Sequence, residues 1–268
     1  MSKFNPEYYR QFRPFYPPEI FKGFRNELLR RKFNEPFQVV DLGCGTGHST
    51  ASLLKTSIRA NVIGIDPDPE MLNQARELAR SLQLGHLRLK EGTGEVTGLP
   101  SESVDAALLG SAFHWMNPEQ TRDELIRILK DSGLIWIFEY QFPKAPALPE
   151  LNEWIRRQFN LVWKAPGQVP RGSFTEVTRV FRQDARFELL SELRPPMIQH
   201  LTMEELAGLI FSQSRVLCYE DTLSSSEKTK FRDDTRDSLR DLMGIEPAVF
   251  HFTLQGLSMA KTPATIRG

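Results

Sequence analysis

Short apolar runs alternate with longer amphipathic stretches between residues 36 and 140 of this 268-residue chain. Polar or turn-forming residues bound each run, a pattern typical of strands buried in a parallel sheet. The runs lie at 37–42, 61–66, 86–91, 104–109 and 134–139. Because the stretches between them are long enough for crossover helices, the alternation predicts βαβ units and an α/β fold.

The stretches between the runs carry the signals of helices. After the second run, apolar residues between 71 and 82 fall on one helical stripe. Before the fifth run, Asn117 predicts an N-cap, Pro118 suits the first helical position, and we expect Gly133 to end the helix.

The second half of the chain is less regular. Helical patterns occur within 143–186 and 201–245, where Thr202 and Glu205 have the spacing of a capping box. Strand-like patterns occur at 187–193 and 248–261.

The charge balance narrows the classes of partner. The chain has 34 basic and 34 acidic side chains, so no global field attracts a polyanion or an acidic membrane surface. We therefore expect no nucleic-acid partner and no membrane association. Charged residues and prolines interrupt the first 20 residues, where a signal peptide needs a continuous apolar segment. Their presence favours a soluble cytoplasmic protein.

Cys44 and Cys218 are the two cysteines. Two are too few for a disulfide framework or a structural zinc site, so we expect free thiols and predict no metal site. Cys44 lies inside a glycine-rich loop, where we expect it to pack rather than to react.

That loop, in the stretch VVDLGCGTGHST at 39–50, is the sharpest motif in the chain. It brings Gly43, Gly45 and Gly47 together directly after the first apolar run. Glycine permits positive φ angles and lets a ligand approach the backbone, and the following helix offers unpaired N–H groups. A plain tight turn needs one such residue, so three predict a ligand-binding loop.

Asp66, the acidic residue that ends the second apolar run, narrows the class of ligand that the loop can bind. The carboxylate of Asp66 suits a ribose diol, because it accepts from two vicinal hydroxyls. A nicotinamide dehydrogenase has this feature too, but its fingerprint is G-x-G-x-x-G. Here the order is G-x-G-x-G, with Asp41 before the first glycine, which disfavours that class of enzyme.

Four segments, VVDLGCGTG, VIGID, GTGEVTGLPSESVD and GSAFHW, resemble the class I S-adenosylmethionine-dependent methyltransferases. Within that class the chain is similar to small-molecule enzymes such as trans-aconitate methyltransferase. The N-terminal YYRQFRPFYPPEIF and the SQSRVL at 212–217 resemble segments of the same group. The match is specific over 39–66 and 92–115 and loose after residue 145.

The resemblance implies a Rossmann-like, seven-stranded, mostly parallel sheet whose last strand is antiparallel. It also implies one methyltransferase domain over 1–268, with a cofactor-binding core at 36–142. The other segments would be helical cap insertions at 143–186 and 201–245 and final strands at 187–200 and 248–261.

The resemblance also implies a set of residues around S-adenosyl-L-methionine. Gly43, Gly45 and Gly47 would approach its methionyl part, with Asp41 near the ammonium group and Ser111 beside the methionine moiety.

The other implied contacts involve the rest of the cofactor. Asp66 would hold the ribose hydroxyls, Thr93, Gly94 and Glu95 would flank the adenine, and Arg13 would meet the carboxylate. Gly94 stands where this group usually has alanine, and we expect a slightly wider adenine pocket there.

The chemistry of a sulfonium methyl requires little of the protein beyond alignment of the acceptor, because the methyl group is already electrophilic. A carboxylate acceptor is ionised at neutral pH, whereas a phenol, an amine or a carbon acid must lose a proton. His114 follows the fourth run and is the candidate base. We favour a role in ordering the loop from Ser111 to Trp115, because the resembling group methylates carboxylates, which need no base.

The sequence therefore predicts a methyltransferase for a small molecule, with a carboxylic acid favoured as acceptor. Methylation of carbon, nitrogen or a phenolic oxygen with His114 as base is the alternative, and so is a regulatory module that binds the cofactor without turnover. The pattern does not fix the acceptor or the oligomeric state.

Overall fold

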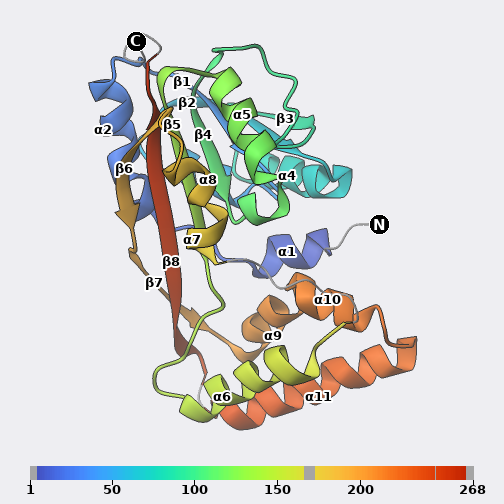
Figure 1. Cartoon of the computed structure of the whole chain (residues 1–268). Coiled ribbons are helices and arrows are strands. Elements are labelled where there is room, and N and C mark those ends of the chain that lie inside the picture. Colours follow the sequence, from blue (N-terminus) through green and yellow to red (C-terminus); the bar gives the residue numbers. More distant parts are fainter. Residues whose placement is uncertain (1–4, 166–172, 245, 264–268) are drawn as a thin grey trace. The chain divides into compact units, whose positions relative to one another are not determined.

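The computed structural model describes residues 5–165, 173–244 and 246–263 (Figure 1). These residues belong to two compact units. The larger unit comprises Phe15–Tyr140, Arg171–Pro195 and Leu254–Gly268, and the smaller unit comprises Met1–Pro14, Gln141–Pro170 and Pro196–Thr253.

The larger unit is built on a sheet in the order β3-β2-β1-β4-β5-β8-β6. Its strands are β1 (Phe37–Leu42), β2 (Ala60–Asp66), β3 (Leu87–Glu91), β4 (Val104–Gly110), β5 (Leu129–Tyr140), β6 (Phe187–Leu193) and β8 (Ala248–Lys261). β1 to β5 pair in parallel, and β8 is antiparallel to both β5 and β6. The predicted Rossmann-like α/β fold with an antiparallel last strand is confirmed.

An eighth strand, β7 (Pro196–Leu201), pairs with the first residues of β8. The sequence pattern did not identify it as a separate strand, because it opens with a proline and alternates only weakly between apolar and polar residues. The seven predicted strands are thus present, and β7 extends the pairing of β8.

The helices of the larger unit cover both faces of the sheet. They are η1 (Pro18–Phe21), α2 (Lys22–Arg30), α3 (His48–Leu54), α4 (Pro69–Ser81), η2 (Phe113–Trp115), α5 (Pro118–Ile128), α7 (Phe174–Val177) and α8 (Arg179–Arg182). The predicted Asn117 cap is confirmed, since its side chain accepts from the N–H of Gln120.

Alternation along β5 explains the two covered faces. Ile135 and Ile137 join a core cluster with residues of α5, α7 and α8. Trp136 and Phe138 point the other way and meet Phe24 of α2 and Phe21 of η1 edge-on. Because successive strand residues face opposite sides, one strand supplies both halves of the core, and α2 and α5 flank the sheet (Figure 1).

The expected end of α5 at Gly133 is wrong. The helix ends at Ile128, and β5 begins at Leu129 with an irregularity before its regular pairing with β4. Ser132 has a φ of 65° within this irregularity, and a Cβ on Gly133 would lie 2.9 Å from the backbone oxygen of Lys130. Gly133 therefore serves a tight irregularity inside the strand.

The smaller unit is mainly helical. Its helices are α1 (Pro6–Phe12), α6 (Pro149–Arg157), the π-helix η3 (Gln158–Val162), α9 (Met203–Phe211), α10 (Ser214–Glu220) and α11 (Ser225–Met243). The capping box of Thr202 and Glu205 is confirmed at the start of α9. The cap role assigned to 143–186 and 201–245 stays a prediction, as does the division into domain segments.

Helix α9 is the buried centre of this unit, and α1 and α11 pack against it. Gly208 makes the close approach of α1 possible, because a Cβ at this position would lie 2.2 Å from the ring of Phe12. In the same unit, the buried side chain of Glu220 accepts hydrogen bonds from Nε and Nη2 of Arg232, at 2.7 and 2.9 Å.

The Gly208 contact predicts a large effect of a small substitution. Gly208→Ala should lower the free energy of unfolding by about 1–3 kcal/mol, because the new methyl group overlaps the Phe12 ring. Thermal and denaturant unfolding measure the change.

Gly23→Ala is the matched control, since Gly23 lies in α2 and a Cβ at this position would have nothing within 4 Å. It should raise stability by about 0.5–1 kcal/mol through helix propensity alone. Equal effects of the two substitutions would contradict the proposed packing of α1 on α9.

Candidate cofactor site

The predicted site residues of the larger unit follow the carboxyl ends of neighbouring strands. The glycine loop follows β1, Asp66 is the last residue of β2, residues 93–95 follow β3, and Ser111 and His114 follow β4. In a parallel sheet these ends share one edge, which is where open α/β sheets bind ligands. The structure thus brings together all the predicted residues except Arg13, which belongs to the smaller unit.

The glycine loop is fixed to the neighbouring strand by its backbone. The N–H groups of Gly43 and Cys44 both donate to the carbonyl oxygen of Ile65, at 2.8 and 3.1 Å. Gly43 has a φ of 66°, and a Cβ there would lie 2.5 Å from the Cβ of Ala112. Gly45 also has a positive φ, of 54°, but a Cβ there would meet nothing within 4 Å. The loop is therefore packed at Gly43 and open at Gly45.

Asp41 is fully buried beneath this loop. Its Oδ2 accepts from the hydroxyls of Ser49 at 2.5 Å and Thr50 at 2.6 Å. Its Oδ1 has no hydrogen-bond partner within the described parts of the chain. Burial raises the pKa of Asp41 to about 6, against the two hydroxyl donors and with help from the charge of Asp66. A buried acceptor without a partner is costly and is the natural place for a donor on a ligand.

Asp66 has both carboxylate oxygens anchored by backbone donors. Oδ2 accepts from the N–H of Gly45 at 2.8 Å and Oδ1 from the N–H of Asp68 at 3.0 Å. Burial raises its pKa, and these two bonds act in the opposite direction. Each oxygen has a further lone pair, so the carboxylate still has acceptors for two hydroxyls.

The loop after β3 is held near the start of α5. The Oγ1 of Thr93 accepts from the N–H of Val96 at 3.2 Å, and the Oε1 of Glu95 accepts from the N–H of Asn117 at 2.6 Å. A Cβ on Gly94 would lie 2.5 Å from the Sδ of Met116. The expected extra space at Gly94 is therefore occupied by the thioether of Met116, a residue that no sequence signal marked.

Ser111 is held in an unusual backbone conformation, with a φ of 52°. Its Oγ accepts from the hydroxyl of Tyr16 at 2.7 Å, and the Tyr16 ring packs edge-on against Phe138 at 4.7 Å between centroids. Such a conformation persists when the surroundings determine it, and Tyr16 supplies part of that constraint. Tyr16 lies in the N-terminal segment that carried the family resemblance, yet its own role had no separate signal.

His114 has a neighbour that the sequence did not suggest. Its Nδ1 lies 3.5 Å from Oε2 of Glu139, near the end of β5, and its side chain is 5% exposed. The ring of Trp115 lies 5.3 Å away and is half-exposed. Glu139 is 25 residues further along the chain, so only the pairing of β4 with β5 reveals the contact.

Arg13 contacts two residues of the smaller unit. Its Nη2 donates to the carbonyl oxygen of Ser212 at 3.1 Å, and its guanidinium carbon lies 4.7 Å from the centroid of the Tyr9 ring. Arg13 and Ser212 belong to the two terminal segments singled out by the resemblance. The role of Arg13 toward a cofactor carboxylate stays a prediction.

Comparison with known proteins identifies the domain that contains this edge of the sheet. Residues 40–137 match a family model described as a methyltransferase domain. An uncharacterized methyltransferase of Mycobacterium tuberculosis is 28% identical over 245 residues, which cover 90% of this chain and 84% of that protein. The trans-aconitate 2-methyltransferase of Azoarcus sp. is 31% identical over 120 residues, 44% of this chain and 45% of that protein.

Solved structures agree on the fold. A proposed type II methyltransferase from Anaeromyxobacter dehalogenans superposes with a TM-score of 0.66 at 20% identity, over 94% of this chain and 98% of that one. The matched domain and these relatives support assignment of the chain to the class I S-adenosylmethionine-dependent methyltransferases, with S-adenosylmethionine as the cofactor, whereas the solved structure shows the fold alone. None of the helices in the described part of the chain is long and apolar enough to cross a membrane.

The raised pKa of Asp41 predicts a pH-dependent stability difference. A folded-state pKa of about 6 against an ordinary 3.8 means that the folded protein binds this proton more tightly than the unfolded chain does. The protonation of Asp41 contributes to the free energy of unfolding in full below about pH 4. This contribution, on the order of 3 kcal/mol, is lost as the pH rises through about 6.

Asp41→Asn removes this titration and keeps the shape. The variant should gain stability relative to the wild type between pH 4 and pH 7, measured by chemical unfolding without cofactor across that range. Because every other carboxyl titrates in both proteins, the difference isolates Asp41. A difference that stays constant with pH would contradict the buried, weakly paired carboxylate.

Proposed function

We propose that this chain transfers the methyl group of S-adenosylmethionine to a carboxylate of a small organic acid. One observation supports the cofactor site above all others: the buried Oδ1 of Asp41 lacks a partner among the described residues, beneath a glycine loop whose open side is at Gly45. An ammonium donor would satisfy that oxygen and lower the pKa of the carboxyl.

The neighbouring residues fit the rest of the cofactor. The carboxylate of Asp66 has lone pairs left for the ribose hydroxyls, and residues 93–95 lie at the same edge for the adenine. Ser111, held by Tyr16, would contact the methionine moiety. Arg13 would receive its carboxylate as a guanidinium fork.

The bound cofactor supplies an electrophilic methyl group, so the residues of this chain have to bind, orient and exclude water. Positioning alone can lower a barrier by roughly 7–11 kcal/mol. A carboxylate is already ionised at neutral pH and needs no base. The similarity to a trans-aconitate 2-methyltransferase, named for a carboxylic acid, supports this acceptor class.

A second candidate has an observation of its own. Glu139 lies 3.5 Å from Nδ1 of His114 and would orient the imidazole. With this partner, His114 would act as general base for an amine, a phenol or a carbon acid.

The cytoplasmic location and the absence of a nucleic-acid partner also stay predictions.

The ribose role of Asp66 predicts a specific loss of affinity. Asp66→Asn should weaken binding of S-adenosylmethionine and S-adenosylhomocysteine by about 10- to 100-fold, because a charged acceptor to two hydroxyls is removed. Isothermal titration at fixed pH measures both ligands, with NADH expected to give no signal.

Asp68→Asn is the matched control for this titration. Asp68 lies two residues further on and caps α4 through its side chain, a task that asparagine performs equally well. Equal weakening by both substitutions would indicate local damage rather than a ribose contact. Binding of NADH in place of the sulfur ligands would contradict the proposed site.

The acceptor chemistry predicts the behaviour of His114→Gln and Glu139→Gln. Carboxyl methylation should change by less than about threefold in kcat for both variants, with base-labile methyl esters as the products. With an acceptor that needs a base, His114→Gln would instead lower kcat by at least about 100-fold. Glu139→Gln would then also lower kcat, because the imidazole loses its orienting partner.

The assay uses labelled cofactor against a panel of carboxylic acids, amines and phenols. His86→Gln is the control, because His86 is exposed and lies before β3, at the other end of the strands. Transfer to an amine or a phenol only would overturn the carboxyl proposal. No transfer across the panel despite tight cofactor binding would favour a regulatory binding module.

A further inference from the structure

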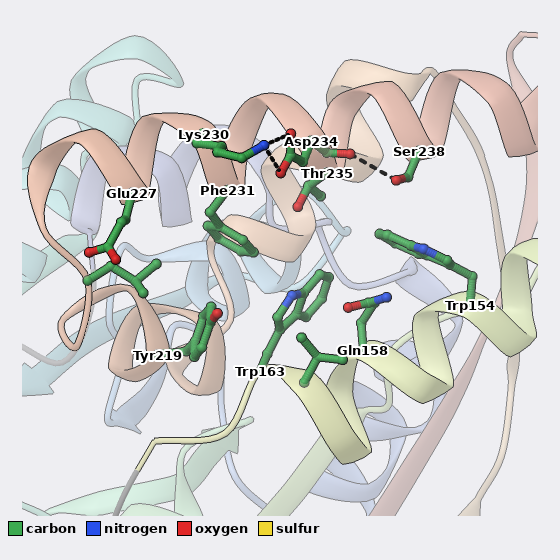
Figure 2. Close-up of a pocket in the computed structure, with 12 residues that line it drawn as sticks. Trp154, Gln158, Trp163, Tyr219, Glu227, Lys230, Phe231, Asp234, Thr235 and Ser238 are labelled. Carbon is green, nitrogen blue, oxygen red and sulfur yellow. Dashed lines mark hydrogen bonds and ion pairs between the residues drawn. The ribbon is translucent and has the colours of Figure 1, made fainter.

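The smaller unit contains a pocket of about 400 Å³ that none of the methyl-transfer residues lines. It is formed by α6, the π-helix η3 and Trp163 on one side and by α11 on the other, with Tyr219 of α10 at one end (Figure 2). Its aromatic lining residues are Trp154, Trp163, Tyr219 and Phe231.

These aromatic rings meet at steep angles. Trp163 contacts Trp154 at 82° and Phe231 at 85°, with centroids 5.8 and 5.7 Å apart. Tyr219 meets Phe231 at 74° and 5.4 Å. Trp163 is buried, whereas the other three are partly exposed. The pocket is therefore lined by one buried ring, Trp163, and by three partly exposed aromatic rings.

The polar groups of this pocket have unused bonding capacity. The side chains of Gln158 and Thr235 and the hydroxyl of Tyr219 make no hydrogen bond to any described residue, and Figure 2 shows Gln158 between the two tryptophans. Gln158 and Val162 both come from the π-helix η3. Such helices occur mostly as single turns and frequently at functional sites.

The charges around the pocket favour a cation. Among the described residues that line it, Lys230 is the basic one, and its Nζ lies 2.9 Å from both carboxylate oxygens of Asp234. Glu227 remains as an unbalanced anion. Its Oε2 caps α11 by accepting from Ser224, while its Oε1 has no partner in the described part of the chain. Hydrogen bonds from the Ser224 side chain and backbone lower the pKa of Glu227, so it is ionised at neutral pH.

We propose that this aromatic pocket binds an organic ammonium ion, either a protonated amine or a quaternary ammonium group on a small body. The electron-rich faces of Trp154, Tyr219 and Phe231 would contact the cation, and Glu227 would supply the net negative charge. Gln158, Thr235 and the Tyr219 hydroxyl would accept hydrogen bonds from the polar part of the ligand. This site does not depend on the identity of the methyl acceptor.

Choline and its neutral isostere 3,3-dimethylbutan-1-ol are the probes, titrated into the full chain without cofactor. The readout is the set of indole N–H signals of the four tryptophans in a ¹⁵N-labelled sample. Choline should shift the Trp154 and Trp163 signals and bind about tenfold more tightly than the alcohol. Trp154→Phe and Trp163→Phe assign the signals.

Glu227→Gln should weaken choline binding by about two- to fivefold, because an exposed charge pair is lost while the glutamine still caps the helix. Glu205→Gln is the matched control, as Glu205 holds the same capping-box position in α9 outside the pocket. Phe231→Leu keeps an apolar side chain but removes the aromatic ring, and it should weaken choline binding by at least about fivefold.

Equal affinity for choline and the alcohol would overturn the proposal, and so would equal effects of Glu227→Gln and Glu205→Gln. Shifts confined to the Trp115 and Trp136 signals would also overturn it, since both belong to the larger unit. Failure of S-adenosylmethionine binding would leave these titrations unaffected, so the two proposals fail separately.

Discussion

The buried carboxylate of Asp41 is the constraint on which the carboxyl edge of the sheet depends. It lies in β1, at the centre of the parallel strands, where an ion is expensive to hold. Ser49 and Thr50, both in the first turns of α3, satisfy one oxygen and so fix the start of that helix against the strand. The other oxygen has no partner among the described residues, and a donor on the proposed cofactor would explain why the fold retains a group that destabilises it.

The backbone at Ser111 carries a further cost. Gly43, Gly45 and Ser111 all have positive φ angles, which the two glycines adopt without strain and Ser111 does not. The strands beneath are buried on both faces, with Trp136 and Phe138 packed on one side and aliphatic residues on the other. A rigid scaffold of this kind is what holds strained residues in place, and positioning is the main contribution a protein makes to methyl transfer.

The sequence predicted the parts of the molecule that depend on local pattern. The five parallel strands, the Asn117 cap, the capping box at Thr202 and the glycine loop all follow from periodicity or from one residue's backbone preference. The start of β5 and the strand β7 were missed, because an irregular pairing and a weak edge strand are decided by neighbours distant in sequence.

The same distinction separates the predicted site residues from the missed ones. Asp66 ends a recognisable strand and was found, whereas Met116 and Glu139 act through contacts made only when strands and loops assemble. Tyr16 reaches Ser111 across 95 residues of sequence. Spacing alone carries no trace of such contacts.

The division of residues between the two units has a consequence for specificity. Every residue assigned to the cofactor except Arg13 belongs to the larger unit, and the matched methyltransferase domain lies inside it as far as residue 137. Under the predicted cap role, changes in the helices of the smaller unit would alter acceptor binding without disturbing Asp41, the glycine loop or Asp66. That separation would let one cofactor site serve different acceptors, because function is set by the residues of a site and not by the fold that carries it.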